Sequence, residues 1–216
     1  HHLSAPGSGA DFEQIAVSLR EELDLRAFAQ AWQQLEARHE VLRTSFRWEG
    51  VDEPLQQVQS ELAIAPVTQD WSALPAAESA ARLESYLRED RRRGFDLRAA
   101  PLSRVAVFRT GADRCEIVWS FPHILLDGRS FPLVLGELFD LYDALRRGSP
   151  QQLPPARPFR EHVAWLAARD GSGDAAFWRE RLAGFTAPTP LPGGAPAASA
   201  ATRGESDLRL SRAHSN

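Results

Sequence analysis

The stretch FPHILLDGRS, residues 121–130, holds the side chains best suited to chemistry. A neutral imidazole accepts a proton near neutral pH, so His123 is a candidate general base. Asp127 is the right residue type to pair with an arginine and hold the turn, and the Gly128 N–H can approach a reacting oxygen. The H-x-x-x-D-G pattern alone is weak evidence for an active site, because a pattern with only three fixed positions recurs by chance. Taken alone, it is better explained by an ordinary histidine in a turn.

The neighbouring sequence predicts a strand before His123 and a helix after it. Residues 102–110 and 114–121 are apolar runs on either side of a Gly-Ala-Asp turn, which indicates a β-hairpin. Pro122 has no N–H for a ladder, so the second strand must end there or lie at a sheet edge. Residues 130–147 carry a helical apolar pattern that Gly148 closes.

Strands and helices alternate in the rest of the chain. Residues 14–20 alternate apolar and polar side chains and predict a strand, and residues 24–40 predict a helix capped by Asp24. Further predicted elements are strands at 41–48 and 54–59, a helix at 76–93, and helical segments at 159–170 and 175–185. This order favours an α/β fold.

Composition excludes several classes of function. The net charge is -4 and the basic residues are scattered, so we expect no nucleic-acid partner. No apolar run is long enough to span a bilayer, so we expect no membrane association. The single cysteine, Cys115, fits a reducing, cytoplasmic location, and the histidine spacings give no metal site.

Composition also divides the chain along its length. Residues 1–11 are interpreted as an expression tag or disordered start, because the chain opens on two histidines and contains no methionine. Residues 187–206 are rich in Pro, Gly, Ala and Ser and predict a linker. We expect residues 12–186 to form one lobe and residues 207–216 to begin a second, truncated one.

RHEVLRTSF, at residues 38–46, and FPHILLDGRS together resemble the condensation domain of nonribosomal peptide synthetases. That domain belongs to the chloramphenicol acetyltransferase-like superfamily. The likeness also covers RRRGFDLRAAPLSRVAVF and FWRERLAG, and so nearly all of residues 12–186. It implies the N-terminal lobe of such a domain: an α/β, chloramphenicol acetyltransferase-like lobe with a mixed, mainly antiparallel sheet flanked by helices.

The resemblance also implies an activity. In the family, the histidine matched by His123 faces a tunnel, where an amine on one carrier protein attacks a thioester on another. His123 is then the catalytic residue that removes the proton from the amine or positions it, and the Gly128 N–H stabilises the oxyanion. The family binds no cofactor directly and uses the phosphopantetheine arms of its carrier proteins. We expect this chain to be inactive without the remaining C-terminal lobe.

Four further residues match supporting positions of the family. Asp127 corresponds to an aspartate that holds the turn by pairing with an arginine, for which Arg38 is the first candidate and Arg43 the second. Trp178 matches a later tryptophan, and core packing on a helix is the more ordinary role for it.

Two departures from the family pattern keep other functions open. Pro122 stands where the family usually has a first histidine, and Arg129 stands where a tryptophan commonly follows the glycine. A proline cannot replace the hydrogen bonds of an imidazole. The alternatives are a stand-alone H-x-x-x-D acyltransferase that acts on a soluble acceptor, and a catalytically silent condensation-like module that recruits other proteins.

Overall fold

The structure is a computed structural model that describes residues 11–60, 62, 64–149, 153–187 and 189. The chain divides between Ala167 and Ala168 into two compact units. Of the expected start segment only residue 11 is described, and the expected second-lobe segment, 207–216, lies outside the described residues. Within the described ranges, no helix combines the length and apolar character that crossing a membrane requires.

The helices and strands follow the predicted alternation. The elements of the first unit are β1 (Phe12–Leu19), α1 (Leu25–Arg38), a 3-10 turn (Glu40–Arg43), β2 (Thr44–Arg47), β3 (Leu55–Val58), β4 (Val67–Asp70), α2 (Ala76–Arg93), β5 (Arg104–Gly111), β6 (Arg114–Pro122), α3 (Ser130–Arg146) and α4 (Phe159–Ala168). The second unit contains α5 (Ser172–Arg181).

Four strands form the main sheet, in the order β1-β6-β5-β4. β1 and β5 both pair antiparallel with β6, whereas β4 pairs parallel with β5. The expected mixed, mainly antiparallel sheet is therefore confirmed. The hairpin of β2 and β3 is a separate, two-stranded sheet.

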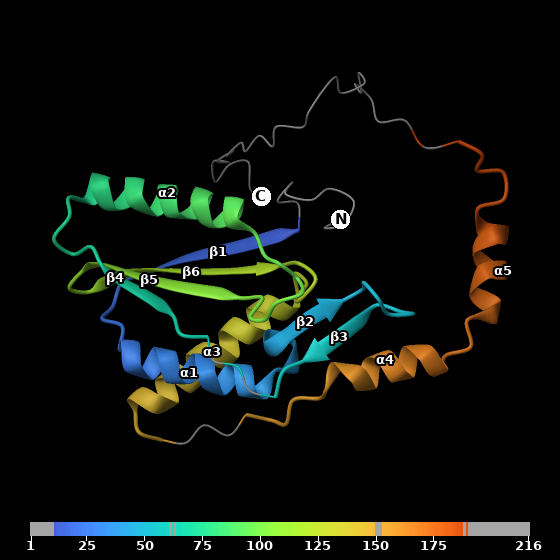
Figure 1. The fold of residues 1–216 in the computed structure, drawn as a ribbon, viewed down its shortest axis with the longest axis horizontal. Coiled ribbons are helices and arrows are strands. Elements are labelled where there is room, and N and C mark those ends of the chain that lie inside the picture. Colours follow the sequence, from blue (N-terminus) through green and yellow to red (C-terminus); the bar gives the residue numbers. More distant parts are fainter. Residues whose placement is uncertain (1–10, 61, 63, 150–152, 188, 190–216) are drawn as a thin grey trace, which may run out of the picture. The chain divides into compact units, whose positions relative to one another are not determined.

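Helices cover both faces of the main sheet, as Figure 1 shows. Val105 and Val107 of β5 pack into the larger core with α1 and α3, while Ala106 and Phe108 face the opposite side. Tyr86 of α2 packs edge-on against Phe108, with ring centroids 4.8 Å apart. The period-2 alternation of β5 thus lets one strand bury apolar side chains against helices on both faces.

Capping and aromatic packing fix α1 against the sheet and α3. The Asp24 carboxylate accepts hydrogen bonds from the N–H groups of Arg26 and Ala27, which confirms the predicted N-cap. Trp32 is fully buried and packs edge-on against Trp119 of β6. The Asp24 N–H donates to the hydroxyl of Tyr142 on α3, so this corner joins both helices.

Two local predictions differ from the structure. The predicted strand 41–48 begins with a 3-10 turn and is extended only over Thr44–Arg47. The Thr44 hydroxyl donates to the carbonyl oxygen of Glu40, a local bond that stabilises this turn. Strand β4 was not predicted, because all four of its residues are exposed and carry no apolar alternation.

Candidate active site

His123 directly follows the last residue of β6, in the turn that leads to α3. Its backbone N–H donates to the carbonyl oxygen of Asp11 at 2.7 Å, and the Leu125 N–H donates to the carbonyl oxygen of Pro122 at 3.0 Å. The strand ends at Pro122, as a residue without an N–H requires. The predicted position of His123, between a strand and a helix, is confirmed.

The His123 side chain is half exposed and contacts a carboxylate that sequence reasoning missed. Its Nδ1 lies 3.1 Å from Oε1 of Glu13, and the two side chains are 54% and 42% exposed. Glu13 lies on β1, directly opposite Phe121 and diagonal to His123. The alternation of residues 14–20 predicted a strand in this region, but only the strand register brings Glu13 to the histidine.

Asp127 orders the turn through the start of α3 rather than through an arginine. Its Oδ1 accepts hydrogen bonds from the Arg129 N–H, the Ser130 N–H and the Ser130 hydroxyl, at 3.1, 2.8 and 2.6 Å. The bonds from Ser130 and Arg129 lower the pKa of this carboxyl below its usual value. An aspartate that satisfies N–H groups at the start of a helix stabilises that end.

The predicted pairing of Asp127 with Arg38 is wrong. Arg38 instead forms a bidentate pair with Glu137 of α3, with Nε–Oε2 and Nη2–Oε1 distances of 2.8 and 3.2 Å. His39 Nε2 lies 2.6 Å from the same carboxylate, and Arg38 also donates to the carbonyl oxygen of Pro154. Burial raises the Glu137 pKa, but the hydrogen bonds from Arg38 and His39 outweigh it and hold that pKa low. Arg38 therefore joins the end of α1 to α3.

Arg43 bonds to another part of the first unit, and Trp178 belongs to the second unit. Arg43 donates to the carbonyl oxygens of Glu36 and Gln59, so it supports the chain after α1. Trp178 lies on α5 in the second unit, is 58% exposed and packs edge-on against Phe177. Its assignment as a side chain that supports the site or packs in a core stays a prediction.

Gly128 leaves its amide accessible. It is exposed, and within the described part of the chain its N–H donates to no protein acceptor. A methyl group added at its Cα would meet no atom within 4 Å, and its φ is not in the left-handed region. The glycine is therefore not required by local sterics, whereas its N–H is free to bind an oxygen outside the chain.

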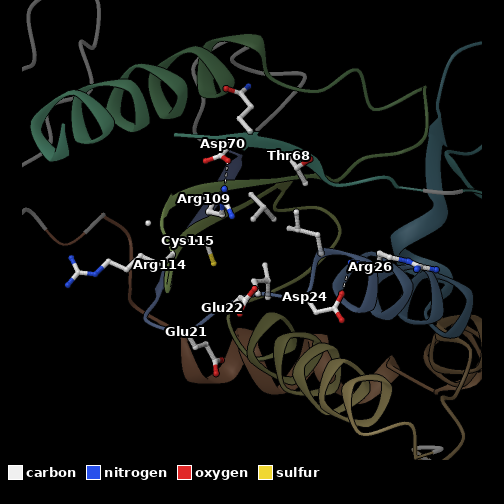
Figure 2. A pocket seen from close by; sticks show the side chains of 15 residues that line it. Glu21, Glu22, Asp24, Arg26, Thr68, Asp70, Arg109, Arg114 and Cys115 are labelled. Carbon is white, nitrogen blue, oxygen red and sulfur yellow. Dashed lines mark hydrogen bonds and ion pairs between the residues drawn. The ribbon is translucent and has the colours of Figure 1, made fainter. Parts of the chain in front are cut away.

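A cavity lies at the other end of the sheet. It has a volume of about 520 Å³, and Asp70, Arg109 and Cys115 are among the residues that line it, as Figure 2 shows. Cys115 precedes His123 by eight positions of an extended chain, which separates the two by roughly 25 Å. Burial, with Glu116 and Glu21 nearby, raises the Cys115 pKa, so this thiol is a poor nucleophile. The cavity therefore does not provide the chemistry expected of His123.

We predict that Asp127→Ala lowers the melting temperature of the chain, whereas Asp127→Asn leaves it nearly unchanged. Asparagine retains an acceptor for the N–H groups of residues 129 and 130, and alanine does not. The expected difference between the variants is about 2–4 °C in thermal unfolding followed by circular dichroism. Equal melting temperatures for the two variants would contradict the capping role of Asp127.

A family model with the description "Condensation domain" matches residues 1–214. One of the linear gramicidin synthase proteins of Brevibacillus parabrevis is 40% identical over 192 residues, which are 89% of this chain and 2% of that protein. Bacitracin synthase 3 of Bacillus licheniformis is 35% identical over 191 residues, which are 88% of this chain and 3% of that protein. The range matched by the family model includes residues 1–11, which we interpreted as a tag or disordered start.

Two solved structures are also similar. The SgcC5 protein of Streptomyces globisporus is 27% identical, with a TM-score of 0.69 over 83% of this chain and 41% of that one. The starter condensation domain of rhizomide synthetase has a TM-score of 0.77 at 19% identity, over 87% of this chain and 46% of that one. The second likeness shows the fold. The chain thus spans less than half of each of these solved chains and only 2% and 3% of the two synthases.

Proposed function

Because this chain belongs to the condensation domain family, we propose that it supplies the catalytic histidine for amide formation in nonribosomal peptide biosynthesis. The donor is an acyl thioester on one carrier protein and the acceptor is an amine on another. The observation that carries the proposal is the position of His123 on the turn between β6 and α3, with its ring accessible. His123, Asp127 and Gly128 occupy the family's motif positions.

The proposed reaction follows from these groups. The amine nitrogen attacks the thioester carbon, and the carbonyl oxygen becomes an oxyanion that the Gly128 N–H stabilises. A neutral His123 accepts the proton that the attacking nitrogen releases. The C–N bond forms and the C–S bond breaks, and the departing thiolate of the phosphopantetheine arm takes the proton from the imidazolium. Amide and free thiol are the products, and His123 returns to its starting state.

We propose that a second lobe completes the site. The near-attack arrangement of two carrier-bound substrates requires walls on both sides of the reacting atoms. His123 is half exposed in this chain, which agrees with a site that has only one of its walls. The same proposal makes residues 12–186 the N-terminal lobe of the domain. It takes carrier proteins as the partners and the cytoplasm as the location.

The proposal is tested by product formation. The polypeptide that joins this chain to the second lobe is mixed with a loaded donor carrier and a loaded acceptor carrier, and the acceptor is analysed by mass spectrometry. The expected result is acceptor mass increased by the acyl group. The 216-residue chain tested by itself is expected to give none.

Two outcomes would favour the other functions. Product formed on a soluble amine or alcohol, but not on a carrier-bound amine, would support a stand-alone acyltransferase. Binding of carrier proteins without any product would support a silent recruitment module. The departures at Pro122 and Arg129 favour the second outcome, whereas the motif residues His123, Asp127 and Gly128 oppose it.

A further inference from the structure

We infer that Glu13 is a positioning residue that fixes the tautomer and orientation of His123, an inference that rests on the proposed function. The two side chains come from different strands of the same ladder. Oε1 of Glu13 lies 3.1 Å from Nδ1 of His123, an ion-pair contact between the two side chains. Glu13 lies outside FPHILLDGRS, so the motif stretch by itself does not reveal this contact.

The sheet register explains why Glu13 can reach the histidine. β1 and β6 are antiparallel, with Glu13 opposite Phe121 and Phe12 opposite Pro122. His123 continues this register past the end of β6, because its N–H donates to the carbonyl oxygen of Asp11 at 2.7 Å. Glu13 is therefore a diagonal neighbour of His123, at a distance that a long side chain spans.

The chemistry of the contact assigns the proton. A carboxylate only accepts hydrogen bonds, so a hydrogen bond formed across this 3.1 Å contact requires Nδ1 to be the protonated nitrogen of the neutral ring. The nitrogen left without a proton is then Nε2, which is the one that can accept a proton from an amine. Glu13 thus prepares the ring for the role proposed above, without contacting substrate. The arrangement repeats the physical logic by which a carboxylate orients a catalytic histidine in hydrolases.

Two other hydrogen bonds order the turn around His123 but do not involve its ring. The Asp11 carbonyl fixes the backbone of His123, and Asp127 fixes the start of α3. Neither bond acts on the imidazole itself, whereas the contact with Glu13 is made by the ring nitrogen Nδ1. Both side chains are partly exposed, which agrees with a ring that contacts Glu13 on one side and is open to solvent on the other.

The direct test is the tautomer of His123 in the 216-residue chain, read from the ¹⁵N shifts of its ring nitrogens under basic conditions. The wild type is expected to carry the proton on Nδ1. In Glu13→Ala the proton should move largely to Nε2, and Glu13→Gln should retain much of the wild-type signal, because its amide oxygen still accepts. Glu116→Ala is the matched control: it removes another carboxylate that bonds across the same two strands, to Ser18, far from the histidine.

The second test is the rate of condensation by the two-lobed protein. Glu13→Ala is expected to lower turnover about fivefold, the size of effect expected from an ion pair between partly exposed groups, with Glu13→Gln partly restoring it. A wild-type ring protonated on Nε2, a tautomer unchanged by Glu13→Ala, or a shifted tautomer with unchanged turnover would each overturn the inference. Because the tautomer is read without substrate, failure of the proposed condensation reaction would be seen separately, as wild-type protein that makes no product.

Discussion

Replacing His123 by alanine is expected to lower condensation turnover by about 100- to 10,000-fold, the usual contribution of a general base. The variant loses Nε2, the atom proposed to accept the proton of the attacking amine. The backbone bond to the Asp11 carbonyl does not depend on the side chain, so the turn between β6 and α3 should persist. The measurement is single-turnover amide formation with loaded carrier proteins, followed by mass spectrometry.

Two further variants separate base catalysis from other effects of this substitution. His123→Asn keeps an amide N–H that can donate to Glu13 but has no equivalent of Nε2, so its turnover should fall as far as that of alanine. His162→Ala removes an imidazole from α4, where the ring stacks on Trp165, and should leave turnover unchanged. Wild-type turnover in His123→Ala would exclude the catalytic assignment. Asparagine that retains most of the activity would instead indicate that His123 positions the amine.

The sequence allowed the strand-turn-helix around His123 to be predicted, because strong apolar patterns and turn residues define both elements. The same reasoning missed β4, whose exposed residues enter the sheet only through pairing with β5. It also assigned Arg38 to Asp127, whereas the arginine binds Glu137, which lies on the face of α3 toward α1. Oppositely charged residues have many possible partners in a sequence, and the packing of the helices selects one of them.

Glu36 is a second residue whose environment the sequence did not reveal. It lies between Leu35 and Ala37 near the end of α1, and its charged side chain is fully buried. Both carboxylate oxygens lie near the Ile64 N–H, at 3.1 and 3.0 Å, and Arg43 binds the backbone carbonyl of Glu36 instead of the carboxylate. Burial raises the Glu36 pKa from 4.5 to about 7, against the smaller effect of the Ile64 bond.

This raised pKa predicts that the chain loses stability as the pH rises. The ordinary pKa of the Glu36 carboxyl is 4.5 and its pKa in the folded chain is about 7. At pH values between these two, the folded chain holds the Glu36 proton and the unfolded chain has largely lost it. Glu36 therefore makes its full contribution to the free energy of unfolding below pH 4.5. This contribution is lost as the pH rises through about 7. Between about pH 5 and about pH 8 the expected loss is about 2–3 kcal/mol.

Glu36→Gln isolates this contribution, because glutamine keeps an acceptor for the Ile64 N–H and does not ionise. Urea unfolding of wild type and variant at the two pH values gives the difference directly, and other titrating groups cancel in the comparison. We expect the fall in unfolding free energy to be about 2–3 kcal/mol smaller in Glu36→Gln. Glu84→Gln, at a position of α2 that is 71% exposed, removes the same charge and should follow the wild type. If Glu36→Gln loses as much stability as the wild type over this range, the Glu36 carboxyl does not hold its proton in the folded chain.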